Sequence, residues 1–416
     1  MPNRKNSDKT CSFCGRSNAE VNLLLSGAYG NICDDCIRQA YDMLQSAMKE
    51  QSSASQGKKK SQTDVSVPFP SQIKAHLDKY IIGQDEAKIC MSVAVYNHYK
   101  RIGQPQDNDD VEIEKSNIVM VGPTGTGKTL MARTIARLVN VPFTIVDATV
   151  FTEAGYVGED IESILSRLLQ AADYDVEQAE KGIVFIDEID KIARKQDNPS
   201  ITRDVGGEGV QQGLLKLLEG SVVNVPPKGG RKHPDQSYIQ VDTKNILFIC
   251  GGAFDGIERK IAQRLNTRIV GFNAVINTQD VDKSNFMKYI LPQDLKSFGL
   301  IPEIIGRLPI LTHLNPLGKE ALRRILVEPQ NAIVKQYEKL MAMDGIKMTF
   351  DDDALDFIVE KAMEYKLGAR GLRSIVEGIM RDAMFSLPES KRRTFKVTRE
   401  YAQQHFKDTA SEPVEK

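Results

Sequence analysis

GPTGTGKT, residues 122–129, sets the class of fold that this chain can adopt. It follows the apolar run IVMV at 118–121 and precedes the helical pattern LMARTIARLV at 130–139. The spacing G-x-x-x-x-G-K-T between a strand and a helix indicates a phosphate-binding loop. Glycines permit backbone conformations that a Cβ excludes, so successive N–H groups can point at phosphate oxygens beside the positive end of the helix. A glycine-rich turn that precedes a helix by chance is the alternative, and the flanking strand argues against it.

The loop also supplies side chains for a nucleotide and its metal. Lys128 is expected to reach the β- and γ-phosphates, and the Thr129 hydroxyl to bind Mg2+. The predicted ATP contacts are the loop and the residue after it: Gly122, Pro123, Thr124, Gly125, Thr126, Gly127, Lys128, Thr129 and Leu130.

A second apolar run, GIVFIDE at 182–188, ends in two carboxylates. We expect it to form a buried parallel strand beside the strand at 118–121, with Asp187 assisting Mg2+ and Glu188 deprotonating the attacking water. An acidic turn after a strand is common and carries little weight alone. Together with the phosphate loop, the pair predicts hydrolysis of a nucleoside triphosphate, ATP above all, with Lys128, Asp187 and Glu188 as catalytic residues.

Size and composition are those of an ordinary globular protein. The 416 residues suit two or three domains, with 41% hydrophobic and 27% charged residues. A net charge of −1 gives no field that favours nucleic acid or anionic lipid, so we expect neither as a partner. The first ten residues lack the apolar core of a secretory signal, and no apolar run approaches the ~20 residues that span a bilayer. The expected compartment is the cytoplasm.

Four of the six cysteines lie near the start of the chain, as Cys11, Cys14, Cys33 and Cys36. Two C-x-x-C pairs separated by eighteen residues predict a tetrahedral Zn2+ site. Disulfides are the alternative, and they conflict with a cytoplasmic location. A module of this size cannot fold on apolar burial alone, so the metal is expected to fold it.

The charge of this module argues against a DNA-binding finger, which needs clustered basic residues. Residues 11–50 hold three basic and five acidic side chains. The apolar stretch at 21–25 and the helical pattern at 37–48 suit a protein–protein surface instead.

Strands alternate with helices from residue 68 onward, which predicts a doubly wound parallel sheet with nucleotide at the carboxyl ends of the strands. Beyond Asn315 and Pro316 the pattern becomes mainly helical, with short runs at 347–350 and 394–397 that can pair as strands. The predicted organisation is a zinc-binding domain at 1–50, a flexible linker at 51–67, a large ATPase domain at 68–314, a small domain at 315–407 and a disordered tail at 408–416.

Two further segments suggest contact surfaces. GYVG at 155–158 carries an aromatic residue between glycines, and a Tyr156 folded back onto its own domain is the alternative to an exposed one. Arg231, Lys232 and His233 are expected to form a basic surface, because His233 has no partner at metal-ligand spacing.

Together these motifs resemble the ClpX family of AAA+ unfoldases. A four-cysteine module, a linker, GPTGTGKT, GYVG, IVFIDEIDK, an RKH loop, IPEIIGRLP and GARGLR occur here in one order over nearly the whole chain. The zinc module and the RKH loop distinguish it from the related unfoldase HslU. The resemblance implies a homohexameric ring that hydrolyses ATP and threads a protein through its axial pore into the ClpP peptidase. It also implies chaperone activity without the peptidase, and adaptors that bind through the zinc domain.

The resemblance implies roles for residues around the nucleotide. Arg307 would be the arginine finger that reaches a neighbour's γ-phosphate, and Arg370 the sensor arginine of the small domain. Ile81 and Ile82 would line the adenine pocket. For both arginines an exposed or ion-paired side chain is the ordinary alternative. The polar sensor residue expected near Cys250 is not assigned.

It also implies contacts with substrate and peptidase. The substrate-contacting positions would be Tyr156 and Val157 in a first pore loop, Arg203 and Val205 in a second pore loop at 203–211, and Arg231, Lys232 and His233 at the pore entrance. The peptidase-docking tripeptide would be Val270, Gly271 and Phe272, where the family usually has Ile-Gly-Phe. The lost methylene is worth ~1 kcal/mol at most per buried contact, so docking is expected to survive.

Two other functions stay open at the level of sequence. A nucleic-acid motor with a zinc finger is opposed by the acidic balance of residues 11–50. A remodelling chaperone without a peptidase differs from the unfoldase only in lacking peptidase docking at 268–274.

Overall fold

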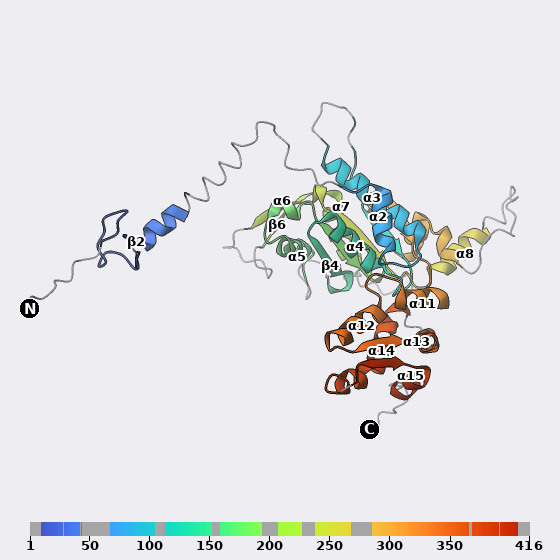
Figure 1. Cartoon of the computed structure of the whole chain (residues 1–416). Helices are drawn as coiled ribbons and strands as arrows, with labels where there is room; N and C mark the ends of the chain where they lie inside the picture. Colours follow the sequence, from blue (N-terminus) through green and yellow to red (C-terminus); the bar gives the residue numbers. More distant parts are fainter. Residues whose placement is uncertain are drawn as a thin grey trace, which may run out of the picture. The chain divides into compact units, whose positions relative to one another are not determined.

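The computed structural model describes residues 10–27, 29–41, 43, 67–104, 111, 113–151, 159–193, 207–226, 238–267, 285–365, 368–390 and 392–406. By its contacts the chain divides into two units, Met1–Asp64 and Val65–Lys416 (Figure 1). The division falls inside the stretch that was predicted as a linker, and the exact domain boundaries remain predictions.

The first unit is a small hairpin followed by a helix. β1 Leu24–Ser26 pairs antiparallel with β2 Asn31–Cys33, and residues 34–41 are helical. Among its described residues the buried apolar side chains are Cys11 and Cys33, whereas Leu23 and Leu25 are about half exposed. This core is too small to hold the unit together by apolar burial, as the sequence predicts.

The second unit is built on a five-stranded parallel sheet with the order β4-β5-β8-β3-β9. Its strands are β3 Ile118–Val121, β4 Phe143–Asp147, β5 Ile183–Asp187, β8 Leu247–Gly252 and β9 Ile310–His313. The apolar runs that predicted strands therefore do form them, because a parallel sheet covered on both faces takes continuous apolar sequence.

The predicted position of the acidic strand was wrong. β5 does not lie beside β3, because β8 pairs with both of them and separates them. β8 packs closely against β5, since a Cβ on Gly251 would lie 2.6 Å from the Phe185 ring. Strand order depends on such packing between distant segments, and the similar apolar runs of β5 and β8 do not reveal it.

Helices cover both faces of this sheet. Before residue 315 the described helices are α2 Pro70–Asp78, α3 Asp85–Ile102, α4 Lys128–Val139, α5 Ser163–Ala171, α6 Val176–Ala179, α7 Glu208–Glu219, α8 Ile257–Thr267, α9 Pro292–Phe298 and α10 Pro302–Gly306. Short 3-10 turns are η1 Ala148–Val150, η2 Ile189–Ile192, η3 Thr243–Asn245 and η5 Phe286–Tyr289, and an antiparallel pair joins β6 Val222–Val225 to β7 Ile239–Asp242.

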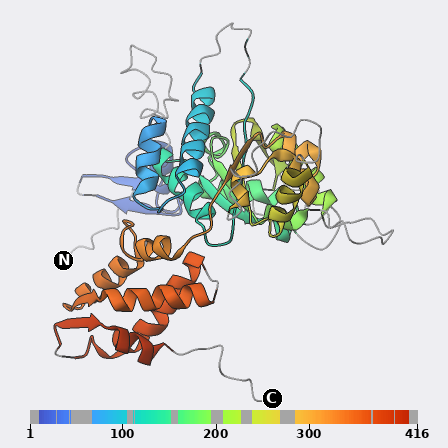
Figure 2. The same cartoon turned by 90° about the vertical axis from the view of Figure 1, so that its right-hand side faces the viewer.

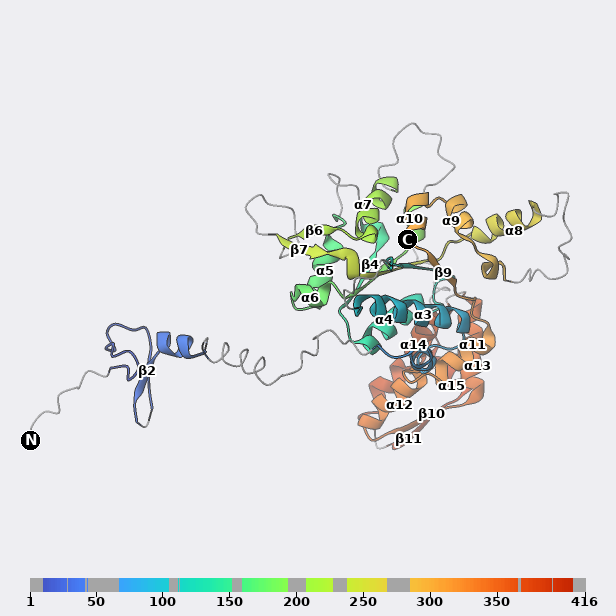
Figure 3. The same ribbon diagram turned by 90° about the horizontal axis from the view of Figure 1, so that it is seen from above.

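Alternate strand residues enter two separate cores, as the two-residue period of a strand requires. Val119 and Val121 of β3 pack with α5, α7 and α10, whereas Ile118 and Met120 pack with α2, α3 and α4. Figure 3 shows α3 and α4 on one side of the sheet and α7, α9 and α10 on the other.

α7 corrects the extent of the predicted second pore loop. Residues 208–211 are helical, and Gln211 is fully buried, donating to the Ile192 carbonyl and accepting from the Ile301 amide. The prediction of a loop over 203–211 was therefore wrong at its C-terminal end. The polar sequence of 208–211 suggested an exposed loop. Gln211 can be buried nevertheless, because backbone groups of distant segments satisfy the hydrogen bonds of its amide.

The residues after 315 form a mainly helical body with its own core. Its elements are α11 Lys319–Val327, α12 Ile333–Met343, β10 Lys347–Phe350, α13 Asp352–Glu364, α14 Gly368–Ser386, β11 Thr394–Val397 and α15 Arg399–His405. The predicted pairing of 347–350 with 394–397 is confirmed, and the two strands run parallel. Figure 2 shows this segment, in orange to red, as a group of helices.

None of the helices described is both long enough and apolar enough to cross a bilayer.

Gly251→Ala tests the packing of β8. The added methyl would meet the Phe185 ring at 2.6 Å inside the sheet, and overpacking of this kind costs about 1–3 kcal/mol. Calorimetry should show a thermal midpoint lowered by about 2–4 °C for each kcal/mol. The control is Gly378→Ala in α14, where a Cβ has open space and the midpoint should stay or rise. An unchanged midpoint for Gly251→Ala would contradict this packing.

Candidate functional site

The phosphate loop connects β3 to α4 and has the backbone that its glycines allow. Gly125 and Gly127 have φ values of +82° and +104°, a left-handed region that favours glycine. A Cβ on Gly122 would lie 2.7 Å from the Leu314 carbonyl oxygen. Gly127 immediately precedes α4, so the free amides of the first helical turn face the loop.

Lys128 is buried within the curve of this loop. Its ammonium donates to the carbonyls of Gly122 and Pro123, the latter at 3.1 Å. Burial lowers the pKa of the Lys128 ammonium, although the carboxylates of Asp187 and Asp190 act to raise it. A positive charge is thus held beside the loop amides, where a phosphate would be bound.

The acidic strand reaches the loop although β8 lies between them. The Thr129 hydroxyl donates to the Asp187 carboxylate over 3.1 Å. Oxygen ligands of this kind suit Mg2+, so the pair fits the metal that ATP brings. The next residue, Glu188, has a left-handed backbone with φ 57° and an exposed side chain, and its amide donates to Asp187 over 3.0 Å.

Asp190 was missed by the sequence analysis. Its buried carboxylate accepts the Ala253 amide at 3.1 Å and lies 3.4 Å from the Lys191 ammonium. It therefore ties η2, which follows Glu188, to the end of β8. The repeated acidic positions of IDEID were the only available signal, and they do not tell a structural carboxylate from a catalytic one.

These groups line a cavity of about 600 Å3. Its lining combines the loop, the acidic turn and the helical body: Thr124, Gly125, Gly127, Lys128, Thr129, Leu130, Asp187, Glu188, Asp190, Lys191, Ala253, Asp255, Ile325, Ala369, Arg370 and Arg373. A Cβ on Gly125 would lie 3.3 Å from the Ala369 amide nitrogen, so α14 touches the loop. Arg370 is thereby brought to the same cavity as Lys128 and Glu188.

Ile81 and Ile82 lie between α2 and α3, and both are buried. The Ile81 side chain would lie 3.9 Å from a Cβ on Gly127, directly behind the loop. Neither isoleucine is among the residues that line the cavity. The structure thus brings Ile81 close to the loop without exposing it to the cavity.

Arg307 is the predicted site residue that the structure keeps apart from the others. It caps α10, and its guanidinium pairs with the Glu219 carboxylate at 3.0 Å. The sheet register sets Ile118 opposite Ile310, so Arg307 stands at the amino end of the strands and the phosphate loop at the carboxyl end. The five steps from residue 117 to residue 122, at ~3.3 Å each, separate these ends by about 16 Å. Arg307 therefore cannot serve its own loop.

The four N-terminal cysteines come together as predicted. Their sulfur atoms all lie within 4.8 Å of one another, and those of Cys14 and Cys33 are 3.7 Å apart. A zinc tetrahedron with Zn–S bonds of ~2.3 Å has S–S edges of about 3.8 Å, whereas a disulfide measures ~2.0 Å. The set fits Zn2+, and all four cysteines are free.

The backbone around Cys11 favours the thiolate form that binds metal. Burial acts to raise the pKa of the Cys11 thiol, but hydrogen bonds from the amides of Cys14, Phe13 and Cys33 lower it to about 6. The Cys33 amide lies 3.3 Å from the Cys11 sulfur. Such amide contacts are typical of metal-binding knuckles and orient the sulfur toward the shared centre.

The positions predicted to contact substrate and peptidase lie outside the described residues. They are Tyr156, Val157, Arg203, Val205, Arg231, Lys232, His233, Val270, Gly271 and Phe272.

A parallel sheet with a phosphate loop, an acidic pair and an arginine from a helical C-terminal body defines an AAA+ ATPase. Comparison with protein families agrees: an AAA domain of the Cdc48 subfamily matches residues 113–311, a ClpX C4-type zinc finger matches 9–46, and the C-terminal D2-small domain of ClpB protein matches 317–397.

Curated relatives extend the match to nearly the full chain. The ATP-dependent Clp protease ATP-binding subunit ClpX of Porphyromonas gingivalis is 66% identical over 403 residues, 97% of each chain. Proteins of the same name from Bacteroides thetaiotaomicron and Bacteroides fragilis are 68% and 67% identical, and cover 96% and 97% of this chain and 96% of their own length. The chain belongs to the ClpX family. It is an ATP-hydrolysing unfoldase and not a peptidase, and it uses ATP, Mg2+ and Zn2+.

Cys14→Ser tests the zinc site. Removing one of four thiolates should abolish stable Zn2+ binding and unfold the first unit, because the metal supplies its folding energy. Metal analysis and limited proteolysis would measure this, and ATPase activity should persist. The control is Cys90→Ser, outside the cluster, which should keep its zinc. Full zinc content in Cys14→Ser would contradict the four-sulfur site.

Proposed function

We propose that this chain assembles as a homohexameric ring that unfolds proteins and threads them into the ClpP peptidase. The observation that carries the proposal is the divided ATP site: one chain supplies the loop, the acidic pair and Arg370, while its Arg307 is about 16 Å away along the sheet. A site that lacks its arginine finger needs a second copy to provide it. The names of the curated relatives support the protease assignment.

Within one chain, each residue of the cavity has a proposed task. Lys128 exchanges the loop carbonyls for the β- and γ-phosphates, and the loop amides hold the remaining phosphate oxygens. Thr129 and Asp187 hold Mg2+, which neutralises charge on the phosphates when bound. Glu188, exposed at the edge of the cavity, orients and deprotonates the attacking water.

The small domain is proposed to sense the nucleotide through α14. Ala369 lies against Gly125, and Arg370 lines the cavity. A change in phosphate occupancy next to these residues alters the angle between the two domains. That rotation is the proposed mechanical step, and it would move the pore loop that carries Tyr156 and Val157 along the axis of the pore.

The substrate contacts stay predictions from sequence and family. Tyr156 and Val157 would grip the threaded chain, aided by Arg203, Val205, Arg231, Lys232 and His233. The contacts made by Tyr156 and Val157 would be apolar and steric, which would explain how one ring moves chains of many sequences. Val270, Gly271 and Phe272 would dock the peptidase, without which the ring acts as a chaperone. Adaptors would bind the zinc unit, and the cytoplasm remains the predicted compartment.

Glu188→Gln tests the general base. The variant should bind ATP with ordinary affinity but hydrolyse it about 10²- to 10⁴-fold more slowly, because the amide cannot accept the proton. Steady-state ATPase rates and equilibrium nucleotide binding measure the two properties. Glu320→Gln, an exposed change in α11, is the control and should behave as wild type. Turnover within a few-fold of wild type would refute the assignment.

Tyr156→Ala tests the coupling of ATP hydrolysis to unfolding. The assay follows degradation of a tagged, stably folded protein by purified ClpP with Mg·ATP, with and without this chain. Wild type should support degradation, and the variant should keep its ATPase activity while losing degradation. The exposed control Tyr174→Ala should retain both. If Tyr156→Ala still degrades the folded protein, the pore-loop assignment is wrong, and if wild type degrades nothing, the proposed function is wrong.

A further inference from the structure

Asn117 is a buried amide at the amino end of β3, directly before the strand that ends in the phosphate loop. Its side chain is 1% exposed. The amide nitrogen donates to the Arg307 carbonyl at 2.9 Å and to the Leu218 carbonyl at 3.1 Å. Its oxygen accepts the Phe248 amide of β8 at 3.4 Å. One side chain therefore joins β3, β8, the end of α7 and the end of α10.

The guanidinium of Arg307 is held by the same segment of α7. Glu219, next to Leu218, accepts from Nε at 3.2 Å and from Nη2 at 3.0 Å. Both side chains are about half exposed, at 51% and 43%. An exposed pair of this kind contributes little to stability, so it orients the guanidinium at the surface but does not fix it there.

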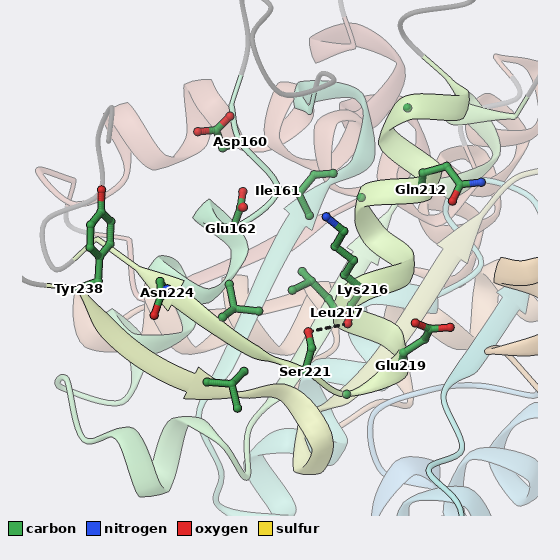
Figure 4. A pocket seen from close by; sticks show the side chains of 15 residues that line it. Asp160, Ile161, Glu162, Gln212, Lys216, Leu217, Glu219, Ser221, Asn224 and Tyr238 are labelled. Carbon is green, nitrogen blue, oxygen red and sulfur yellow. Dashed lines mark hydrogen bonds between the residues drawn. The ribbon is translucent and has the colours of Figure 1, made fainter. Parts of the chain in front are cut away.

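Glu219 borders a hollow of about 830 Å3 on the surface of the large domain. Figure 4 shows Glu219 at the end of α7, on the opposite side of the view from Tyr238. Gln212 and Lys216 of the same helix also line this hollow. Arg307 thus stands at an accessible surface while its backbone is fixed in the core.

We infer that Asn117 is a positioning residue for Arg307, a role that rests on the proposed action of Arg307 on a second copy of the chain. The amide sets the Arg307 backbone relative to β3, and β3 is buried along its whole length. A buried strand in the middle of a sheet is rigid, so it joins the phosphate loop at one end to Asn117 at the other. The position of Arg307, which would act on a neighbour, is thereby fixed relative to the phosphate loop of its own subunit.

A purely structural role for Asn117 makes a different prediction. Loss of the amide would then lower stability and damage the subunit's own ATP site, with no effect specific to its neighbour. The two roles are distinguished by whether a change of Asn117 lowers hydrolysis at the ATP site of the changed subunit or at that of its neighbour.

The experiment uses full-length Asn117→Leu and Asn117→Ser, each assayed below its own thermal midpoint. Leucine has a similar size but no donors, while serine is smaller and keeps a single hydroxyl donor. Uniform rings of either variant should bind a fluorescent ATP analogue normally and lose about 10- to 100-fold in kcat, as small misplacements of catalytic groups do. Arg307→Ala is the reference for complete loss of the finger.

Each variant is then mixed with a large excess of Glu188→Gln. Every variant subunit now receives Arg307 from an intact neighbour, so its activity should return to that of wild type in the same mixture. Arg307→Ala should be rescued in the same way. Wild-type kcat in uniform rings, or no rescue of the Asn117 variants while Arg307→Ala is rescued, would overturn the inference. Failure to rescue Arg307→Ala would instead overturn the proposed action between subunits.

Discussion

The close approach of three chain segments at the phosphate loop is the constraint on which the ATP site depends. The Leu314 carbonyl leaves room for no side chain at Gly122, and the Ala369 amide lies 3.3 Å from where a Cβ of Gly125 would be. Leu314 leads into the small domain, and Ala369 belongs to the helix that carries Arg370. The loop is therefore in contact with both the entry to the small domain and the helix that carries Arg370, so a rotation of that domain would act on the loop directly.

The groups proposed to act in catalysis lie at opposite ends of the strands. The carboxyl edge holds Lys128 and the acidic pair, and the amino edge holds Arg307 beside Asn117. Because the strands between them are buried and tightly packed, the two edges move as one body. In a ring, each subunit would supply the phosphate loop of one ATP site and Arg307 to the ATP site of its neighbour. Such sharing would couple hydrolysis in adjacent subunits.

Sequence reasoning recovered the parts of the fold that local pattern determines. The buried strands, the phosphate loop, the four-sulfur cluster and the pairing of 347–350 with 394–397 all follow from apolar periodicity, glycine spacing and cysteine spacing. It misplaced β5 because strand order depends on contacts between segments distant in sequence, such as the close approach of Gly251 to Phe185. It missed Asn117 and Asp190 for the same reason. The role of a buried polar residue depends on its hydrogen-bond partners, and here these are backbone groups distant in sequence, such as those of Leu218 and Ala253.

If Arg307 acts on a neighbouring subunit, no single chain holds a complete ATP site. The most direct measurement is the ATPase rate per chain over a wide range of protein concentration, with mass determined by light scattering at each point under saturating Mg·ATP. A site completed by a neighbour predicts a rate per chain that falls steeply on dilution, in step with the loss of hexamer. A constant rate per chain in a monomeric sample would contradict it.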